Sequence, residues 1–446
     1  MSTDNFKSKL GIIAATAGSA VGLGNLWGFS YKAGSNGGGN FVLLYLFSVL
    51  FIGIPVMLAE FVIGREGKGG PVGSVEAVTK NKKSLFVSAG YLGALSTFLI
   101  LSFYSVIAGW SIDYLFNTLI NGVAQYRDID TVQHFVDTTG NFNKQVIFQG
   151  IFILATVITV MFGIEKGIEK LSKVLMPLLL GIIVVLVIYS FTLTGFSEAM
   201  VYLFKPSPLP EGVSVFDVFA SALGQAFFSL SVGMGAIITY ARAVNDKENL
   251  SSITLQVAIC DTAVAILAGI AIFPIIFTYG MDPAGGAGLA FMSLPIAFAK
   301  MPFGYIFGNL FFLLLLLAAL TSSISMLENS LTLVLEKSKL SRKSATIILG
   351  IIVLVFGLLS QEGLAFTLPL LNFTGATGFL NQLDSLTMLY TIPIGALIFV
   401  ILVGYRMDKE VVRRQINNDK IANIFIPYIK YVAPILVGVV LIAGLF

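Results

Sequence analysis

Charged residues, cysteine and histidine are all scarce in this chain of 446 residues. Asp, Glu, Lys and Arg make up 11% of it, against about 25% in soluble globular proteins, which argues against a water-soluble enzyme. The single cysteine, Cys260, excludes an internal disulfide. One histidine, His134, and no HExxH pattern leave a membrane enzyme without an obvious metal cluster. Apolar residues are abundant instead, at 56% of the chain.

Long apolar runs predict a multi-pass membrane protein. A helix needs about 20 apolar residues to cross about 30 Å of hydrocarbon. Eleven segments qualify: 10–32, 40–64, 86–118, 146–163, 172–193, 215–242, 252–279, 304–336, 344–360, 384–405 and 426–446. The first lacks a small-residue cleavage site, so we interpret it as a retained span rather than a signal peptide. Residues 279–304 predict short helices over the outer face, and residues 361–380 fit either a loop or the start of the tenth span.

The lysines and arginines are distributed unevenly between the loops. Most of the 27 lie on the side of the N-terminus, and the other side keeps Lys32, Arg127, Lys144, Lys205 and Lys300. The positive-inside rule therefore predicts a cytoplasmic N-terminus, and eleven spans put the C-terminus outside.

Two glycine-containing breaks interrupt membrane-length segments. "AVGLG" (20–24) lies in the first span and "SVGMG" (231–235) in the sixth. Because the two are five spans apart, they have opposite orientations in the membrane. Interrupted helices at matching positions of two halves point to a transporter binding site at an inverted-repeat interface. The alternative is that these are ordinary packing glycines, which are common in membrane helices.

A break of this kind can hold an ion and a zwitterion together. Unwound backbone is tolerated at bilayer depth only where protein or a cavity satisfies it. The freed carbonyls suit a hard cation, and the freed N–H groups at the next half-helix suit a carboxylate. Oxygen-bearing side chains lie at or near both breaks and in spans seven and eight: Asn25, Ser229, Ser231, Asp261, Thr321, Ser322, Ser323 and Ser325.

These polar residues also have simpler interpretations. Asp261 in a span defaults to a functional hypothesis, although a position near the inner end facing water would explain it as well. Hydroxyls in membrane helices commonly bond to the carbonyl four residues earlier. For any single hydroxyl that simpler interpretation is the better one, but the cluster "ALTSSIS" favours a cation site.

Several ungapped blocks resemble the neurotransmitter:sodium symporters, in particular their eleven-span bacterial amino-acid transporters. They are "GSAVGLGNLW", "NGGGNF", "GIPVMLAEFVIGR", "GQAFFSLSVGMGAIITYA", "ALTSSIS" and "KLSRKSA". The resemblance covers nearly the whole chain. It implies an all-α membrane protein forming one transporter domain over 1–446, with inverted five-helix repeats at 10–193 and 215–405, an extra helix at 426–446, and helices 1 and 6 unwound in mid-membrane.

The resemblance also implies two sodium sites and a substrate site. The first sodium would use the carbonyls of Ala20 and Ser229, the side chains of Asn25, Ser229 and Asp261, and the substrate carboxylate. The second would use the carbonyls of Gly18, Val21 and Ala318 and the hydroxyls of Thr321 and Ser322. The substrate residues implied are Ala20, Leu23, Gly24, Tyr104, Phe228, Ser229, Ser231 and Ser322, with a side-chain pocket of Ile100, Met234, Ser323 and Met326. Phe228 would close this pocket, and Tyr104 would meet the substrate carboxylate.

Two positions refine the expected substrate. Monoamine members of the family carry an aspartate where this chain has Gly22, so the ligand must bring its own carboxylate. We therefore expect a hydrophobic L-amino acid, aromatic ones included, carried by sodium-coupled symport with alternating access. Asp261 replaces a neutral asparagine of the animal members, which predicts chloride-independent transport. No nucleic-acid partner or organic cofactor is expected, the surrounding partner is membrane lipid in a bacterial inner membrane, and the oligomeric state stays open.

The chain departs from the family at its gates. Gly28 stands where the family has an arginine that pairs with an acid in span ten, and that acid is retained as Asp384. Lys32 is a candidate replacement for the arginine. At the inner side Glu336 matches the family's acid, and Lys7 is its candidate partner. A channel or a substrate-sensing receptor is a rival interpretation, which vesicle counterflow would test.

Overall fold

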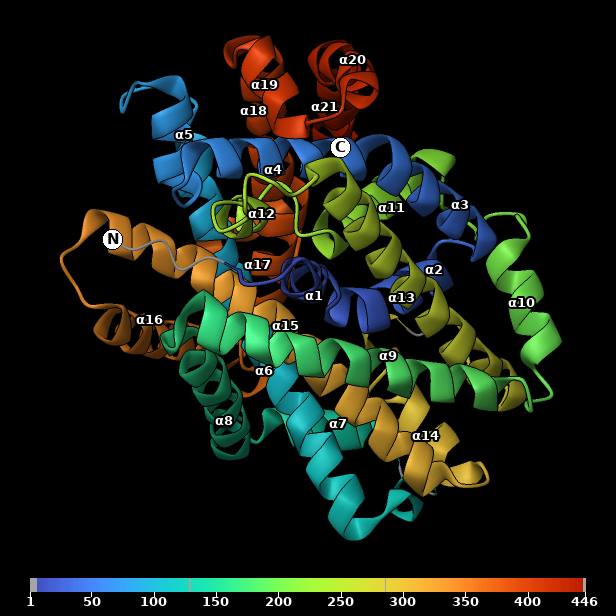
Figure 1. Ribbon diagram of the computed structural model, residues 1–446. Helices are drawn as coiled ribbons and strands as arrows, with labels where there is room; N and C mark the ends of the chain where they lie inside the picture. The colour runs from blue at the N-terminus through green and yellow to red at the C-terminus, as the bar shows by residue number, and fades with distance from the viewer. Residues whose placement is uncertain (1–5, 128–129, 285, 444–446) are drawn as a thin grey trace.

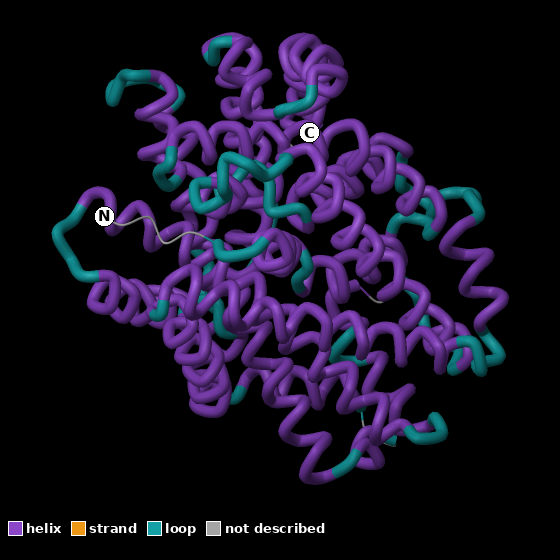
Figure 2. The backbone as a smooth tube through the Cα atoms, viewed as in Figure 1, coloured by secondary structure: helices purple, strands orange, loops and turns teal. Residues whose placement is uncertain are grey.

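The structure is a computed structural model that describes residues 6–127, 130–284 and 286–443. Every regular element among these residues is a helix (Figure 2). The first half contains α1 (Lys9–Ala20), α2 (Phe29–Ser35), α3 (Gly39–Ser48), α4 (Ile54–Gly67), α5 (Pro71–Thr79), α6 (Val87–Asn121), α7 (Thr131–Gly140), α8 (Phe142–Met161), α9 (Lys170–Ser190) and α10 (Phe196–Phe204). The second contains α11 (Val215–Ser229), α12 (Ala236–Ala241), α13 (Leu250–Thr278), α14 (Ser293–Lys300), α15 (Gly304–Lys337), α16 (Arg342–Leu358), α17 (Phe379–Ser385), α18 (Ile392–Ile401), α19 (Lys409–Ile416), α20 (Asp419–Pro427) and α21 (Ala433–Ala443).

The membrane-protein prediction is confirmed by the helices themselves. In the described ranges, eight helices are long and apolar enough to cross a membrane, and a ninth forms if Lys9–Ala20 and Gly24–Ser35 count as one span bent by 51°. The other two predicted spans fall on α11–α12, where the helix is broken, and on α16, which has 17 residues. Each predicted span thus coincides with a helix, although residues 444–446 of the last lie outside the described part.

Two long helices form the centre of the bundle. In their most apolar stretches 83% of α6 and 78% of α15 is buried, against 39% in α8. Helices α6 and α15 pack along each other, and α1 packs on α15, α9 and α13. The broken first helix therefore lies inside the bundle, where neighbouring helices rather than lipid meet its open backbone.

The short helices in the loops lie at two opposite ends of the molecule. In Figure 1, α5, α19 and α20 lie at the upper edge, whereas α7 and α14 lie at the lower edge. The short helices predicted within 279–304 are present as Gly286–Leu289 and α14. The ambiguous stretch 361–380 is a loop with two 3-10 turns, and α17 begins only at Phe379.

Candidate functional site

Helix 1 is broken between α1 and the π-helical segment η1 (Gly24–Gly28), which leads into α2. Helix α1 ends because Val21 is extended, with φ −72° and ψ 105°. A Cβ on Gly22 would come within 2.5 Å of the Ser322 hydroxyl and 2.9 Å of the Tyr104 hydroxyl. The chain needs glycine here because two neighbouring side chains approach the backbone, not because the residue adopts a left-handed conformation.

Hydroxyls from α15 meet the open carbonyls of this break. The Ser322 hydroxyl lies 3.3 Å from the Gly18 carbonyl oxygen and 3.2 Å from that of Val21. The Thr321 hydroxyl lies 3.3 Å from the Val21 oxygen and 3.0 Å from that of Ala318. All four separations exceed the usual O–H···O distance of about 2.7–2.8 Å. The five oxygen atoms predicted to bind the second sodium therefore lie close together, joined only by long hydrogen bonds.

A buried carboxylate lies on the other side of the same break. Asn25 donates from Nδ2 to the Asp261 carboxylate at 2.6 Å and to the Asp261 carbonyl at 3.1 Å. The Ser229 hydroxyl donates to Asp261 at 3.0 Å, and the Tyr45 hydroxyl does so at 3.4 Å. Asp261 is fully buried, so the interpretation that it faces water is wrong. Its hydrogen-bond partners in the described residues are all neutral, which leaves a net negative charge suited to a cation.

Helix 6 is broken between α11 and α12. Three residues of the break have positive φ: Ser231 (54°), Gly233 (82°) and Gly235 (77°). The Glu60 carboxylate accepts a hydrogen bond from the Gly233 N–H. Asn329 donates to the Met234 carbonyl at 3.0 Å.

One side chain links the two breaks directly. The Ser231 hydroxyl donates to the Ser19 carbonyl at 2.8 Å, so the sequence-distant segments "AVGLG" and "SVGMG" are adjacent in space. This contact joins the two interrupted helices, which the sequence predicts to meet at one binding site.

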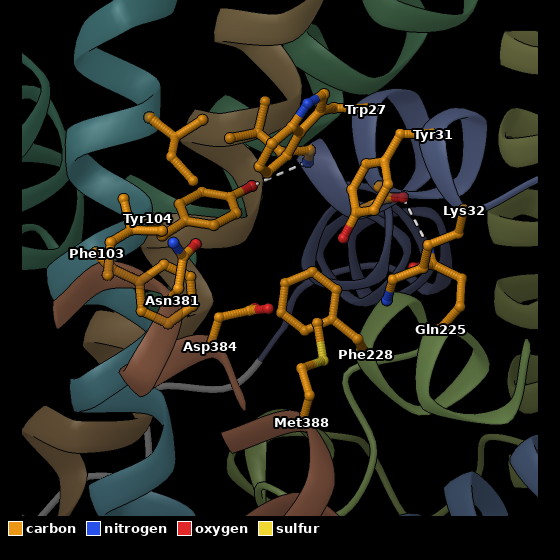
Figure 3. Close-up of a pocket in the computed structure, with 15 residues that line it drawn as sticks. Trp27, Tyr31, Lys32, Phe103, Tyr104, Gln225, Phe228, Asn381, Asp384 and Met388 are labelled. Carbon is orange, nitrogen blue, oxygen red and sulfur yellow. Dashed lines mark hydrogen bonds between the residues drawn. The ribbon is translucent and has the colours of Figure 1, made fainter. Parts of the chain in front are cut away.

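A cavity of about 80 Å³ adjoins the first break (Figure 3). Leu23, Gly24, Tyr104 and Phe228, all predicted for the substrate site, line it. The Leu23 N–H donates to the Tyr104 hydroxyl at 3.1 Å. Figure 3 shows the rings of Tyr104, Phe228 and Tyr31 around this space.

The remaining predicted substrate residues are buried but do not line this cavity. They are Ala20, Ile100, Ser229, Ser231, Met234, Ser322, Ser323 and Met326. The Ser323 hydroxyl lies 2.8 Å from the Thr156 hydroxyl, so it is already partnered across to α8. The amine and side-chain parts of the predicted site are thus buried in the helix bundle, outside this cavity.

Sequence reasoning missed three polar residues of the site. Tyr45 stands in a run of apolar residues, where it resembles a lipid-facing aromatic. The Gln225 side chain donates to the Gly24 carbonyl at 2.7 Å. Asn329 donates to the Met234 carbonyl in the break of helix 6. The available signal was an amide in the middle of an apolar span, which marks Gln225 and Asn329 but not Tyr45.

The gates differ from the arrangement that the resemblance implies. Gln225 fills the space over Gly28, since a Cβ there would lie 3.3 Å from its Oε1. Lys32 and Asp384 line the same cavity. At the N-terminal end Lys7 pairs with Glu165 at 2.6 Å. Glu336 instead accepts hydrogen bonds from the backbone of Gly70 and Gly73, so the pairing of Lys7 with Glu336 is wrong.

Comparisons with known proteins agree with this architecture. The model of the sodium:neurotransmitter symporter family matches residues 3–127 and 123–446. A sodium-dependent transporter of Haemophilus influenzae is 35% identical over the full length of both chains, and YhdH of Bacillus subtilis, another such transporter, is 32% identical over 92% of this chain and 90% of its own. The crystal structure of MhsT in complex with L-phenylalanine superposes with a TM-score of 0.91 at 37% identity, covering 99% of each chain.

The apolar spans and the match to a transporter family identify the chain as a multi-pass membrane transporter, not an enzyme. More specifically, the chain belongs to the sodium:neurotransmitter symporter family and is a sodium-dependent transporter.

Proposed function

We propose that this transporter is a symporter of hydrophobic L-amino acids, aromatic ones included, driven by sodium. The observation that carries the proposal is the space between Gly22, Ser322 and Tyr104. No aspartate side chain fits at Gly22, so the protein supplies no carboxylate there and the ligand must bring one. The Leu23 N–H and the Tyr104 hydroxyl, 3.1 Å apart, are the donors that a ligand carboxylate would share.

The apolar character of the substrate rests on two further points. The predicted side-chain pocket contains Ile100, Met234 and Met326, and methionines make a pocket apolar and adaptable. MhsT, with the same fold over 99% of the chain, was crystallised with L-phenylalanine. Both support a hydrophobic amino acid over a polar one.

Two sodium ions are proposed, one on each side of the break in helix 1. The first would be held by the carbonyls of Ala20 and Ser229, the side chains of Asn25, Ser229 and Asp261, and the substrate carboxylate. The second would be held by Gly18, Val21, Ala318, Thr321 and Ser322, whose oxygens already converge. Neutral oxygens with at most one carboxylate from the protein suit a monovalent hard cation.

Transport is proposed to be independent of chloride. The fully buried Asp261 carboxylate supplies a fixed negative charge beside the first sodium, where an anion would otherwise be required. Some animal relatives, such as the human GABA transporter 2 (25% identical over 84% of this chain), are named as sodium- and chloride-dependent.

The proposed mechanism is alternating access between two inverted repeats, 10–193 and 215–405. Sodium and the amino acid would bind together from the outer side and neutralise part of each other's charge. Each positive charge moved inward gains about 2.3 kcal/mol per 100 mV of membrane potential. The positive-inside rule supports a cytoplasmic N-terminus and an outer C-terminus.

Uptake by purified protein in liposomes tests the proposal. Twenty radiolabelled L-amino acids are compared with an inward gradient of sodium, and with potassium in its place. We expect phenylalanine, leucine and similar residues to accumulate only with sodium, and equally in chloride and gluconate. Accumulation of an amine that lacks a carboxylate, or uptake that ignores the sodium gradient, would refute it.

A further inference from the structure

A basic and aromatic surface lies where the last two spans approach each other, at the end of the molecule that carries α19 and α20 (Figure 1). Helix 10 ends in the π-helical segment η9 (Leu402–Arg406), and helix 11 contains another, η10 (Tyr428–Val432), between α20 and α21. A Cβ on Gly404 would lie 2.9 Å from the Lys430 Cα, so glycine lets the two backbones touch here. This contact brings Lys430 beside Tyr405. We call the residues 405, 406, 430 and 431 the helix 10–11 surface.

The lysine of this surface is held between two tyrosine rings. The Lys430 ammonium lies 5.2 Å from the centre of the Tyr405 ring and 5.3 Å from that of the Tyr431 ring. Both tyrosines are open to the surroundings, with 53% and 59% of their surface exposed, and Lys430 is half-buried. Contact with the ring faces fixes the position of the cation. One accessible surface therefore presents an ammonium group and two hydroxyls, all of them hydrogen-bond donors.

The positive charge of this surface is not neutralised by an acid. Among the described residues, neither Lys430 nor Arg406 takes part in an ion pair. Asp408, the next acid along the chain from Arg406, accepts a hydrogen bond from the Glu410 N–H as the N-cap of α19. The Arg406 guanidinium lies 5.9 Å from the centre of the Phe86 ring, so it also packs on an aromatic side chain. The helix 10–11 surface is therefore suited to an anion.

An apolar stripe continues from this surface along helix 11. Ile435, Val439 and Ile442 follow Tyr431 at intervals of three or four residues, and all are exposed. Residues at this spacing lie on one face of a helix. An exposed apolar face of a membrane span meets hydrocarbon. A donor-rich end that continues into an apolar stripe matches a molecule with an anionic head and a hydrocarbon tail.

We propose that the helix 10–11 surface binds an anionic phospholipid such as phosphatidylglycerol. The phosphate accepts hydrogen bonds from Lys430 and from the hydroxyls of Tyr405 and Tyr431, and an acyl chain lies along Ile435. Tyrosines favour the membrane–water interface, and basic residues there attract anionic lipids. A zwitterionic phospholipid shares the phosphate but carries an ammonium group of its own, which Lys430 and Arg406 repel. This proposal does not depend on which solute is transported.

Helix 10 connects this surface to break 6. A Cβ on Gly395 of α18 would collide with the Gly233 carbonyl oxygen, and a Cβ on Gly233 would collide with the carbonyl oxygen of Ile392. Helix α18 therefore packs directly on break 6. A lipid bound between helices 10 and 11 contacts the helix that supports this break.

Native mass spectrometry of the full-length protein in an uncharged detergent tests the proposal. The probes are phosphatidylglycerol and phosphatidylcholine with the same acyl chains, and the measurement is the concentration at which half of the protein carries a first lipid. We expect this concentration to be about tenfold lower for phosphatidylglycerol. Lys430→Gln should raise it about tenfold, because a charge-assisted hydrogen bond is lost. Lys430→Arg keeps the charge and should raise it less than about threefold.

Matched controls separate this surface from diffuse positive charge. Lys420 is an exposed lysine on α20, earlier in the same helix, so Lys420→Gln removes an equal charge and should leave lipid binding unchanged. Glycerol phosphate, which has the anionic group without acyl chains, should not displace the lipid. The melting temperature reports that each variant is folded. Equal affinity for the two lipids, equal losses in the two glutamine variants, or displacement by glycerol phosphate would each overturn the proposal, and none of these results bears on sodium-coupled uptake.

Discussion

The breaks in helices 1 and 6 share a glycine pattern but satisfy their open backbone in different ways. At break 1 the carbonyls of Gly18 and Val21 meet neutral hydroxyls at 3.2–3.3 Å, and no residue between Val21 and Gly28 has a positive φ. At break 6 three residues have positive φ, a carboxylate accepts from Gly233, and an amide donates to Met234.

From this difference we expect break 1 to serve ligand binding and break 6 to serve stability. Long contacts to neutral hydroxyls leave the carbonyls of break 1 available to an ion, because a cation can replace a weak hydrogen bond at small cost. Break 6 is held by the hydrogen bonds that its backbone forms with the Glu60 carboxylate and the Asn329 amide. Damage to break 1 should therefore impair ion or substrate binding, and damage to break 6 should lower stability.

Gly22→Ala should have the largest effect. Its Cβ would collide with the hydroxyls of Ser322 and Tyr104, and overpacking of about 1–3 kcal/mol corresponds to about a 5- to 150-fold loss of affinity. We expect sodium-dependent phenylalanine uptake to fall toward the upper end of that range. Gly181→Ala is the control, since no atom lies within 4 Å of its added Cβ. Equal uptake by both variants would contradict the role of break 1.

Asp261→Asn should make transport depend on chloride. Without the buried charge, uptake in gluconate should drop at least about tenfold, the equivalent of about 1.4 kcal/mol, and chloride should restore part of it. The measurement is initial uptake at several chloride concentrations, with the unmodified protein alongside. Stimulation of the unmodified protein by chloride would be inconsistent with the proposed role of Asp261.

Ser322→Ala should weaken sodium binding about tenfold, because a hydrogen bond or ligand contact to a charged group contributes about 1.5–3 kcal/mol. The sodium concentration for half-maximal phenylalanine binding measures this. Ser88→Ala, at an exposed position, is the matched control. If the sodium concentration for half-maximal binding is unchanged, the Ser322 hydroxyl is not a sodium ligand.

Glu60→Ala should act mainly on stability. It leaves the Gly233 N–H unpaired in the interior, at a cost of about 1–3 kcal/mol, which should lower the melting temperature by about 2–6 °C. Glu60→Gln keeps an acceptor and should lower it less. Sodium affinity measured on the same samples should change by less than about threefold. A change in sodium affinity of more than about threefold would contradict the proposed difference between the two breaks.

Much of the site was predictable because its residues stand out locally. Glycines and polar side chains in apolar spans marked Asn25, Asp261, Thr321 and Ser322, and the structure brings each of them to break 1. Tyr45 was not predictable, since a tyrosine in an apolar run looks the same whether it faces lipid or Asp261. The pairing of Lys7 failed for a similar reason, because a surface lysine has several acids within reach and contributes under about 1 kcal/mol.

The sequence by itself determined the membrane class, the positions of the spans and the places where helices 1 and 6 break. These follow from local composition, since hydrocarbon thickness sets span length and glycine weakens a helix wherever it stands. Only the tertiary structure decided which side chain meets which open backbone group. Ser231 reaches Ser19 and Gln361 reaches Gln149 because helices distant in sequence pack together, and no local pattern encodes that choice of neighbour.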